Sequence, residues 1–450
     1  MNKNFLDIEG IFLIAGYIII FTIGFNIYST IKYSREQNLK KFFLYGFYFK
    51  IFASIGFALV YDLYYDRSGD SYYYFYSSCN LGNVFFEDFK SYLRIFFGFV
   101  SKQNIYTLPA GLSYIPAFSD PGKIAVHRFI SPFTILGFKN YYLTIIVLNV
   151  FLYIINWRVF LSFDKIFPDK TKILAYGFLF VPSVLFWGSG ILKDSFTFTF
   201  GLVFISNFYK IFFQRKLNLL NAAKLLLAAY VVISLKPYIL YSYIAGGFVW
   251  LGLNSLKAVK NRVLRVFVLP VIIVGIGFTG IYVLNSVANV VGGSYKDIDS
   301  MLNKAVVSQR DLKQEYYQGT SFDIGDYDPT VEGALSVTPA AIIAGLYRPF
   351  IWEARSAVVF LSGLENFILL LITIYVIYKA GLVGTLRIIS REPFLIFCLV
   401  FSIIMAWGIG LSTSNFGALV RFKIPLMPFF LILWLFILDE YKKVKSEVKS

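Results

Sequence analysis

One short stretch of this chain combines carboxylates, a glycine turn and aromatic side chains: Asp66-Arg67-Ser68-Gly69-Asp70-Ser71-Tyr72-Tyr73-Tyr74. At the edge of a membrane, a partly desolvated carboxylate can act as general base on an acceptor hydroxyl. Asp70 is the first candidate for this base and Asp66 is the second, while Tyr72 and Tyr73 can stack on sugars and hydrogen-bond their hydroxyls. The alternative is a polar turn that caps an interfacial helix within an aromatic belt.

A second stretch predicts a very short hairpin between two apolar segments: Trp187-Gly188-Ser189-Gly190-Ile191-Leu192-Lys193-Asp194-Ser195. Charged side chains close to the membrane plane are energetically costly and usually serve a function or pair with another group. The start of the following helix offers unpaired backbone N–H groups, which together with Lys193 would suit a phosphate. Alternatively, Asp194 caps that helix and Lys193 extends to the headgroups. Trp187 is a candidate sugar contact.

Further basic residues occur on the side of the membrane where the charge bias disfavours them. If they converge, they form a cationic pocket for a lipid-linked phosphate or pyrophosphate, which Arg can bind through two hydrogen bonds. Each could equally be a headgroup anchor, and Glu353 and Glu365 could pair with some of them. The residues are Lys236, Arg348, Arg355, Arg421 and Lys423.

The elements that must position these residues are apolar segments, because a chain with 58% hydrophobic and 15% charged residues cannot hide its apolar surface in one soluble core. Segments of about 17–22 residues are long enough to cross the bilayer. They predict an all-α, polytopic integral membrane protein, a single membrane domain over 1–450, with about eleven spans. The expected spans are 11–30, 42–61, 141–158, 173–189, 195–213, 221–235, 238–256, 266–286, 356–378, 393–411 and 424–439.

Lys and Arg gather in every second connection, which predicts the orientation. Examples are Lys40 and Lys41 after the first span, Lys170 and Lys172 after the third, and Lys442 and Lys443 at the end of the chain. These sides are expected to be cytoplasmic. The N-terminus and the long loops at 62–140 and 287–355 are then outside, and the C-terminus is cytoplasmic.

The outer loops are expected to contain helices that lie in the interface. In Val84–Phe99, an apolar face falls on Phe85, Phe89, Tyr92, Leu93 and Phe96. Ile124–Phe138 continues along the same surface and contains the sole histidine, His127. In the second loop, 296–329 shows little apolar periodicity, and Val331–Leu346 predicts a re-entrant or interfacial helix.

Several functions are excluded or disfavoured. The formal net charge is +16, but most of the basic residues lie in the loops expected to face the cytoplasm, where anionic lipid headgroups attract them. Nucleic-acid binding is therefore not expected. Cys79 and Cys398 lie at different depths without metal-ligand spacing, so we expect neither a disulfide nor a metal site, and no cofactor. The first apolar run is too long for a cleavable signal peptide.

The arrangement resembles the membrane glycosyltransferases that use polyprenyl-phosphate-linked donors, the GT-C class, and the related EpsG-like and O-antigen polymerase-type proteins. The resemblance is carried by Gly69-Asp70-Ser71-Tyr72-Tyr73, by Trp187-Gly188-Ser189-Gly190 with Lys193-Asp194, and by Arg421 and Lys423 before Pro425 and Pro428. Two spans precede the acidic loop here, where many members of the class have one.

The resemblance implies an enzyme of polysaccharide or glycolipid assembly in the bacterial inner membrane. It would transfer a sugar from a polyprenyl-(pyro)phosphate donor to a glycan or lipid acceptor on the outer face. In this hypothesis Asp70 or Asp66 activates the acceptor, and Lys193, Lys236, Arg348 and Arg421 hold the leaving phosphate. The alternatives are a polysaccharide polymerase, a transporter or flippase for lipid-linked oligosaccharide, and a non-catalytic scaffold.

Overall fold

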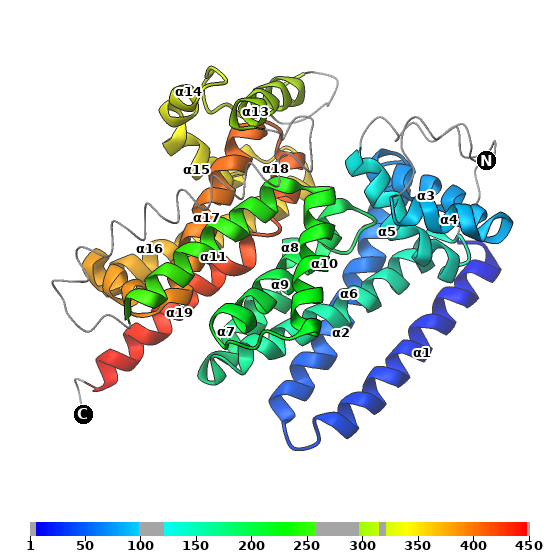
Figure 1. The fold of residues 1–450 in the computed structure, drawn as a ribbon, viewed down its shortest axis with the longest axis horizontal. Coiled ribbons are helices and arrows are strands. Elements are labelled where there is room, and N and C mark those ends of the chain that lie inside the picture. Colours follow the sequence, from blue (N-terminus) through cyan, green and yellow to red (C-terminus); the bar gives the residue numbers. More distant parts are fainter. Residues whose placement is uncertain (1–5, 99–120, 258–296, 315–320, 448–450) are drawn as a thin grey trace. The chain divides into compact units, whose positions relative to one another are not determined.

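The computed structural model describes residues 6–98, 121–257, 297–314 and 321–447, and every regular element within these ranges is a helix (Figure 1). The longer helices are α1 (Ile8–Lys32), α2 (Gln37–Leu59), α3 (Gly69–Glu87), α5 (Pro121–Leu136), α6 (Tyr141–Asp164), α9 (Lys193–Phe212), α10 (Leu219–Leu235), α11 (Pro237–Lys257), α13 (Ile298–Leu312), α16 (Ala357–Arg391), α17 (Pro393–Ser412) and α19 (Met427–Glu447). The shorter ones are η1 (Val60–Tyr64), α4 (Phe89–Phe96), η4 (Pro168–Lys170), α7 (Thr171–Leu179), α8 (Pro182–Trp187), α14 (Val331–Ser336), α15 (Thr338–Tyr347), η7 (Ile351–Glu353) and α18 (Phe416–Phe422). The predicted all-α class is confirmed for these residues.

Among the described residues, six helices are long and apolar enough to cross a membrane, where a continuous helix satisfies every backbone polar group internally. They are Ile8–Lys32, Gln37–Tyr64, Tyr141–Asp164, Lys193–Phe212, Ala357–Arg391 and Pro393–Ser412. A seventh candidate is the pair α18 and α19, which meet at a bend of 65°. Each of the seven overlaps one of the expected spans, and together they have the length and composition of membrane-spanning helices.

The other four expected spans have different outcomes. The segment 173–189 is not one helix: α7 ends at Leu179 and α8 begins at Pro182, because proline lacks the N–H that would continue the helix and restricts the residue before it. The segments 221–235 and 238–256 are α10 and α11, which are not among the six helices above. The segment 266–286 lies outside the described residues.

The amphipathic helix expected over Val84–Phe99 is interrupted at Asp88. The Asp88 carboxylate accepts a hydrogen bond from the Ser91 backbone N–H at 3.0 Å, which ends α3 and begins α4. Hydrogen bonds from Ser91 lower the pKa of Asp88. The break also changes the buried face: Tyr92 packs with Val84, whereas Phe89 is 53% exposed. The helix expected over Ile124–Phe138 is present as α5.

The second long loop contains more helix than its polarity indicates. In 296–329, where the sequence shows little apolar periodicity, Asp297 caps α13 by accepting from the Ser300 N–H at 2.7 Å. The helix expected over Val331–Leu346 is divided at Val337 into α14 and α15. Thr330 caps α14 through the Gly333 N–H at 3.0 Å.

The chain forms two compact units. Unit 1 consists of Met1–Leu161, Val184–Thr199 and Ser234–Lys236, and unit 2 consists of Ser162–Ser183, Phe200–Ile233 and Pro237–Ser450. Within unit 1, helix α1 lies beside α2, and α3 packs on α5. Within unit 2, α17 contacts α11, α15 and α19. The expectation of a single membrane domain stays a prediction.

Candidate functional site

The end of the second candidate spanning helix, Gln37–Tyr64, holds a buried carboxylate, Asp62, within the short π-helix η1. Its Oδ1 accepts from Arg67 Nε at 2.5 Å and from the Tyr72 hydroxyl at 3.1 Å. Its Oδ2 accepts from the Tyr142 hydroxyl at 2.7 Å. A buried charge is stable only when it is paired and hydrogen-bonded, and Asp62 meets both conditions. It joins the end of α2, the following turn, α3 and α6.

The turn after η1 displays the two candidate bases. Asp66 and Arg67 have left-handed backbone with φ of 45° and 58°, and Gly69 follows with φ of 78°. Left-handed backbone at a residue other than glycine costs about 1–3 kcal/mol and persists only where the surroundings enforce it. Asp66 and Asp70 are both exposed, and Asp70 lies in the first turn of α3, where the helix dipole favours its negative charge.

The two candidate sugar-binding tyrosines have different environments. Tyr72 is buried, and its ring stacks on Tyr141 with centroids 4.0 Å apart. Burial raises the pKa of Tyr72 above its usual range, so its hydroxyl acts as a hydrogen-bond donor. Tyr73 is half-buried, with Lys123 Nζ 5.7 Å from its ring centroid and the His127 ring beside it. Tyr73 is therefore the tyrosine of this pair that reaches the surface.

The second motif, the hairpin after α8, is packed inside unit 1. Trp187 is buried, with its ring edge-on to Phe57 at 6.2 Å between centroids, so it is not placed to contact sugar. A Cβ on Gly190 would lie 2.1 Å from the Phe57 ring, which only glycine avoids. The hairpin is thus packed against the C-terminal part of α2.

Two polar side chains from spanning helices hold the hairpin carbonyls. Lys50 of α2 is buried and donates to the Gly188 carbonyl at 2.7 Å, and Asn149 of α6 donates to the Ser189 carbonyl at 2.6 Å. Lys50 therefore places its charge at the C-terminal end of α8, where the helix dipole favours a cation. This contact explains in structural terms why Lys50 is buried.

The charges that follow the hairpin are already paired. Asp194 is completely buried in the first turn of α9, and Lys236 Nζ donates to its Oδ1 at 2.5 Å. Lys236 follows directly after α10, so both charges oppose the partial charges of the helix ends where they lie. A phosphate at the start of α9 would meet the Asp194 carboxylate, which disfavours the expected phosphate site there. Lys193, the first residue of α9, is half-buried.

In unit 2, two of the expected phosphate ligands have partners within the protein. Arg348 forms a salt bridge with Glu353, as expected for one of these pairs, and lies over Phe322 at 4.8 Å from the ring centroid. Lys423 is buried and donates to Leu346 O at 2.8 Å, Arg348 O at 3.0 Å and Asn366 Oδ1 at 2.9 Å. An ammonium has three donors, so Lys423 has none left for a phosphate. The structure brings Arg348 and Lys423 together as structural contacts.

The other two cations of this set differ in exposure. Arg355 is exposed between η7 and α16. Arg421 is half-buried on α18. Their expected role as phosphate ligands stays a prediction.

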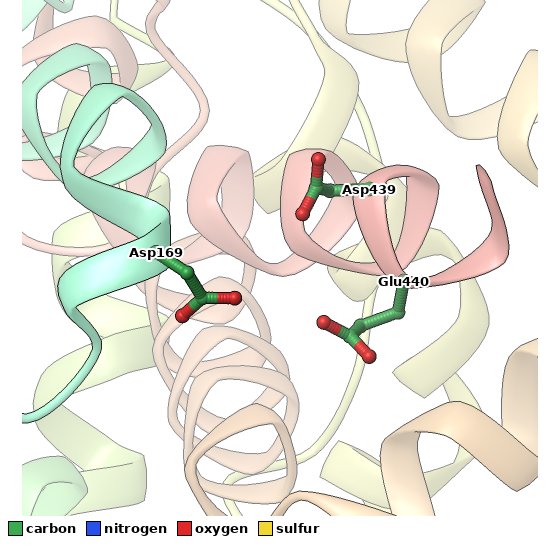
Figure 2. A group of neighbouring side chains, drawn as sticks. All are labelled: Asp169, Asp439 and Glu440. Carbon is green, nitrogen blue, oxygen red and sulfur yellow. The ribbon is translucent and has the colours of Figure 1, made fainter. Parts of the chain in front are cut away.

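Three carboxylates gather in unit 2, Asp169, Asp439 and Glu440, and Figure 2 shows them pointing toward one another from η4 and α19. The ammonium of buried Lys170 lies among them, 2.5 Å from Asp439 and in contact with Glu440. Lys443 contacts Asp169, and this hydrogen bond lowers the pKa of Asp169. Two lysines therefore compensate the acidic charge, and the cluster needs no metal to account for it.

Sequence reasoning missed Asp62, Tyr142 and Lys50. A signal was available for two of them, because Lys50 lies inside the expected span 42–61 and Asp62 directly follows it, and charges at such positions usually have a partner. Tyr142 gave no such signal, since only the folded contact distinguishes it from the other tyrosines. Chemically, unit 1 presents exposed carboxylates on a fixed turn, a half-buried tyrosine and, elsewhere, a half-buried lysine.

The chain was compared with protein families, characterised proteins and solved structures. No family model matches it, and no characterised protein and no solved structure shows significant similarity.

Proposed function

We propose that this protein is a membrane glycosyltransferase. It transfers a sugar or oligosaccharide from a polyprenyl-phosphate or pyrophosphate donor to a glycan or lipid acceptor in polysaccharide or glycolipid assembly. The proposal is carried by the turn after α2, which presents the exposed carboxylates of Asp66 and Asp70 at the end of a candidate spanning helix. It includes about eleven spans, an outer N-terminus, a cytoplasmic C-terminus and the inner membrane of a bacterium.

In this scheme, Asp70 takes the proton of the acceptor hydroxyl as its oxygen bonds to the anomeric carbon. The bond from that carbon to the phosphate oxygen breaks, and the phosphate leaves with the electron pair. We assign the leaving phosphate to the Lys193 ammonium alone and not to the backbone N–H groups at the start of α9, where the phosphate would meet the Asp194 carboxylate; Lys236 is paired with Asp194. Of the three predicted sugar contacts, Tyr72, Tyr73 and Trp187, we keep Tyr73, because Tyr72 and Trp187 are buried.

A polysaccharide polymerase would use the same chemistry with a growing chain as one reactant. The transporter or flippase alternative has one observation in its favour, since it predicts charges deep in the spans, and Lys50, Asp194 and Lys236 are buried charges. Each of them contacts a helix end or a partner charge, however, so their positions have a structural explanation. We therefore prefer the glycosyltransferase to the transporter or flippase.

The proposal is tested in cells whose own copy carries Asp70→Asn, with Asp66→Asn in parallel. The lipid-linked and surface glycans are profiled, and the amount of protein in the membrane is measured. The matched control is Glu87→Gln, which removes an exposed carboxylate from the last turn of the same helix, α3. We expect Asp70→Asn to lose one surface glycan and accumulate its lipid-linked precursor at normal protein level, while Glu87→Gln changes neither.

An unchanged glycan profile in both aspartate variants would remove this turn from the reaction. The transporter is distinguished by where the precursor accumulates: a flippase defect leaves it on the cytoplasmic leaflet, whereas a transferase defect leaves it on the outer leaflet. An outer-leaflet precursor therefore supports the enzyme.

A further inference from the structure

Asp62 is close in sequence to the candidate bases but is not itself placed to meet a substrate. Its side chain is 3% exposed. Three donors from three parts of unit 1 already approach its two oxygens. A substrate hydroxyl therefore has no access to this carboxylate, and its part in the molecule must act through the groups that it holds.

The first of these groups is the turn itself. The Arg67 guanidinium donates Nε to Asp62, and the Arg67 backbone N–H donates to the Tyr61 carbonyl at 3.0 Å. Side chain and backbone of one residue are thus tied to the same π-helix. This double attachment enforces the left-handed backbone of Asp66 and Arg67, which the chain would otherwise avoid.

The second group is the first turn of α3, which carries Asp70. Tyr72 donates to Asp62 and stacks on Tyr141, and the Tyr141 hydroxyl shares a hydrogen bond of 2.7 Å with Ser71. Tyr142 of α6 donates to the other Asp62 oxygen. Asp70 is therefore flanked on both sides by segments that Asp62 and its partners fix.

We propose that Asp62 is a positioning residue, which acts through Arg67 and Tyr72 to fix the strained turn and helix start that present Asp66 and Asp70. The effect on sugar transfer rests on the proposed function. The effect on the turn does not, so the two are measured separately.

The turn is measured by trypsin cleavage after Arg67 in the purified, full-length protein in detergent micelles. A hydrogen bond to a charged group is lost in Asp62→Asn, so we expect its initial cleavage rate at this site to rise roughly 10- to 100-fold. Asp62→Glu keeps the charge and should give a rate between those of Asp62→Asn and the unchanged protein. Glu87→Gln is the control and should leave the rate unchanged.

The reaction is measured by the glycan profile in cells. We expect Asp62→Asn to reproduce the precursor accumulation of Asp70→Asn, and Arg67→Lys, which keeps a cation beside Asp62, to retain more surface glycan than Arg67→Gln. A misplacement near 1 Å is enough to lower a rate by about 100-fold. Rescue by the charge-preserving variants separates positioning from a loss of folding.

An unchanged cleavage rate in Asp62→Asn would overturn the proposal. So would a normal glycan profile in Asp62→Asn when Asp70→Asn loses the glycan. If cleavage rises in Asp62→Asn but neither Asp62→Asn nor Asp70→Asn alters the glycan profile, Asp62 does fix the turn, and the proposed function is wrong. Should Asp62→Asn not accumulate in the membrane, Tyr142→Phe removes one hydrogen bond and keeps the charge, and a rise of about 2- to 10-fold in cleavage is then expected.

Discussion

Lys423 shows how a single residue's chemistry is decided by its neighbours. Its position before two prolines resembles that of a phosphate ligand, yet its ammonium donates to two backbone carbonyls and to Asn366. Lys236 and Arg348 are engaged by Asp194 and Glu353 in the same way. Residue type and spacing identify these cations as candidates, but whether each one binds a ligand or the protein itself depends on contacts that are distant in sequence.

The buried Asp194–Lys236 ion pair should contribute to the stability of the protein. Removing one partner of a buried ion pair leaves an uncompensated charge and typically costs about 3–5 kcal/mol, whereas replacing both by neutral groups costs less. We expect Asp194→Asn and Lys236→Met each to lower the melting temperature in detergent, and the double variant to be more stable than either. The check is a double-mutant cycle by thermal unfolding. Additive losses would show that the two charges are not coupled.

In unit 2, helices α15 and α17 pack closely through glycine residues. Gly410 of α17 lies against the backbone of Ala341 on α15, where an added Cβ would be 2.1 Å from the carbonyl oxygen. Gly345 of α15 meets the backbone of Ala406 in return, also at 2.1 Å. Small residues allow helix backbones to approach this closely in membranes.

The glycines of α17 provide a matched pair of variants. Gly410→Ala should force the two helices apart and destabilise the protein by about 1–3 kcal/mol, as overpacking does. Gly408→Ala is the control, because a Cβ there meets nothing within 4 Å and alanine favours helix. Thermal unfolding in detergent should separate the two variants. Equal melting temperatures would contradict the close contact between α15 and α17.

The hairpin after α8 gives a second prediction for elements. Its Gly188 carbonyl accepts from Lys50, which is 13 residues from Gln37 and 14 from Tyr64 in the spanning helix Gln37–Tyr64. At 1.5 Å per residue, Lys50 lies about 20 Å from either end of that helix, and the hairpin also contacts Phe57, about 10 Å from Tyr64, so the whole hairpin lies below the end of the helix. Backbone that is not helical is tolerated at such depth only when protein surrounds it.

We accordingly expect a cysteine in place of Ser189 to resist a water-soluble maleimide from both sides of the membrane. The label should react only after denaturation. Ser68→Cys in the exposed turn is the positive control, and Cys79 and Cys398 are replaced by serine in both proteins. Rapid labelling of the cysteine at position 189 would show that the hairpin lies at the membrane surface, as the sequence alone predicted.

These elements also show what a sequence can predict. Long apolar runs located α1, α2, α6, α9, α16 and α17, because hydrocarbon thickness fixes their length. The break at Pro182 and the cap at Asp88 were visible in residue type, but apolar length and periodicity outweighed them. The Asp62 site was not predictable in this way, because Tyr142 joins it only through folding.

At the scale of the whole molecule, charge placement makes the last prediction. Lys170 and Lys443 lie in connections expected to face the cytoplasm, and both belong to the cluster with Asp169, Asp439 and Glu440. The start of α7 and the end of α19 must therefore lie on one side of the membrane. The positive-inside bias predicts that this side is cytoplasmic.

A fluorescent protein fused after Ser450 should therefore fluoresce, and alkaline phosphatase fused there should be inactive, because it matures only outside the cytoplasm. A phosphatase fused after Tyr65, where the second candidate span has ended, should be active. Active phosphatase at the C-terminus together with inactive phosphatase after Tyr65 would reverse the orientation of the whole chain. The turn with Asp66 and Asp70 would then face the cytoplasm, where soluble nucleotide-sugar donors could replace the lipid-linked donor.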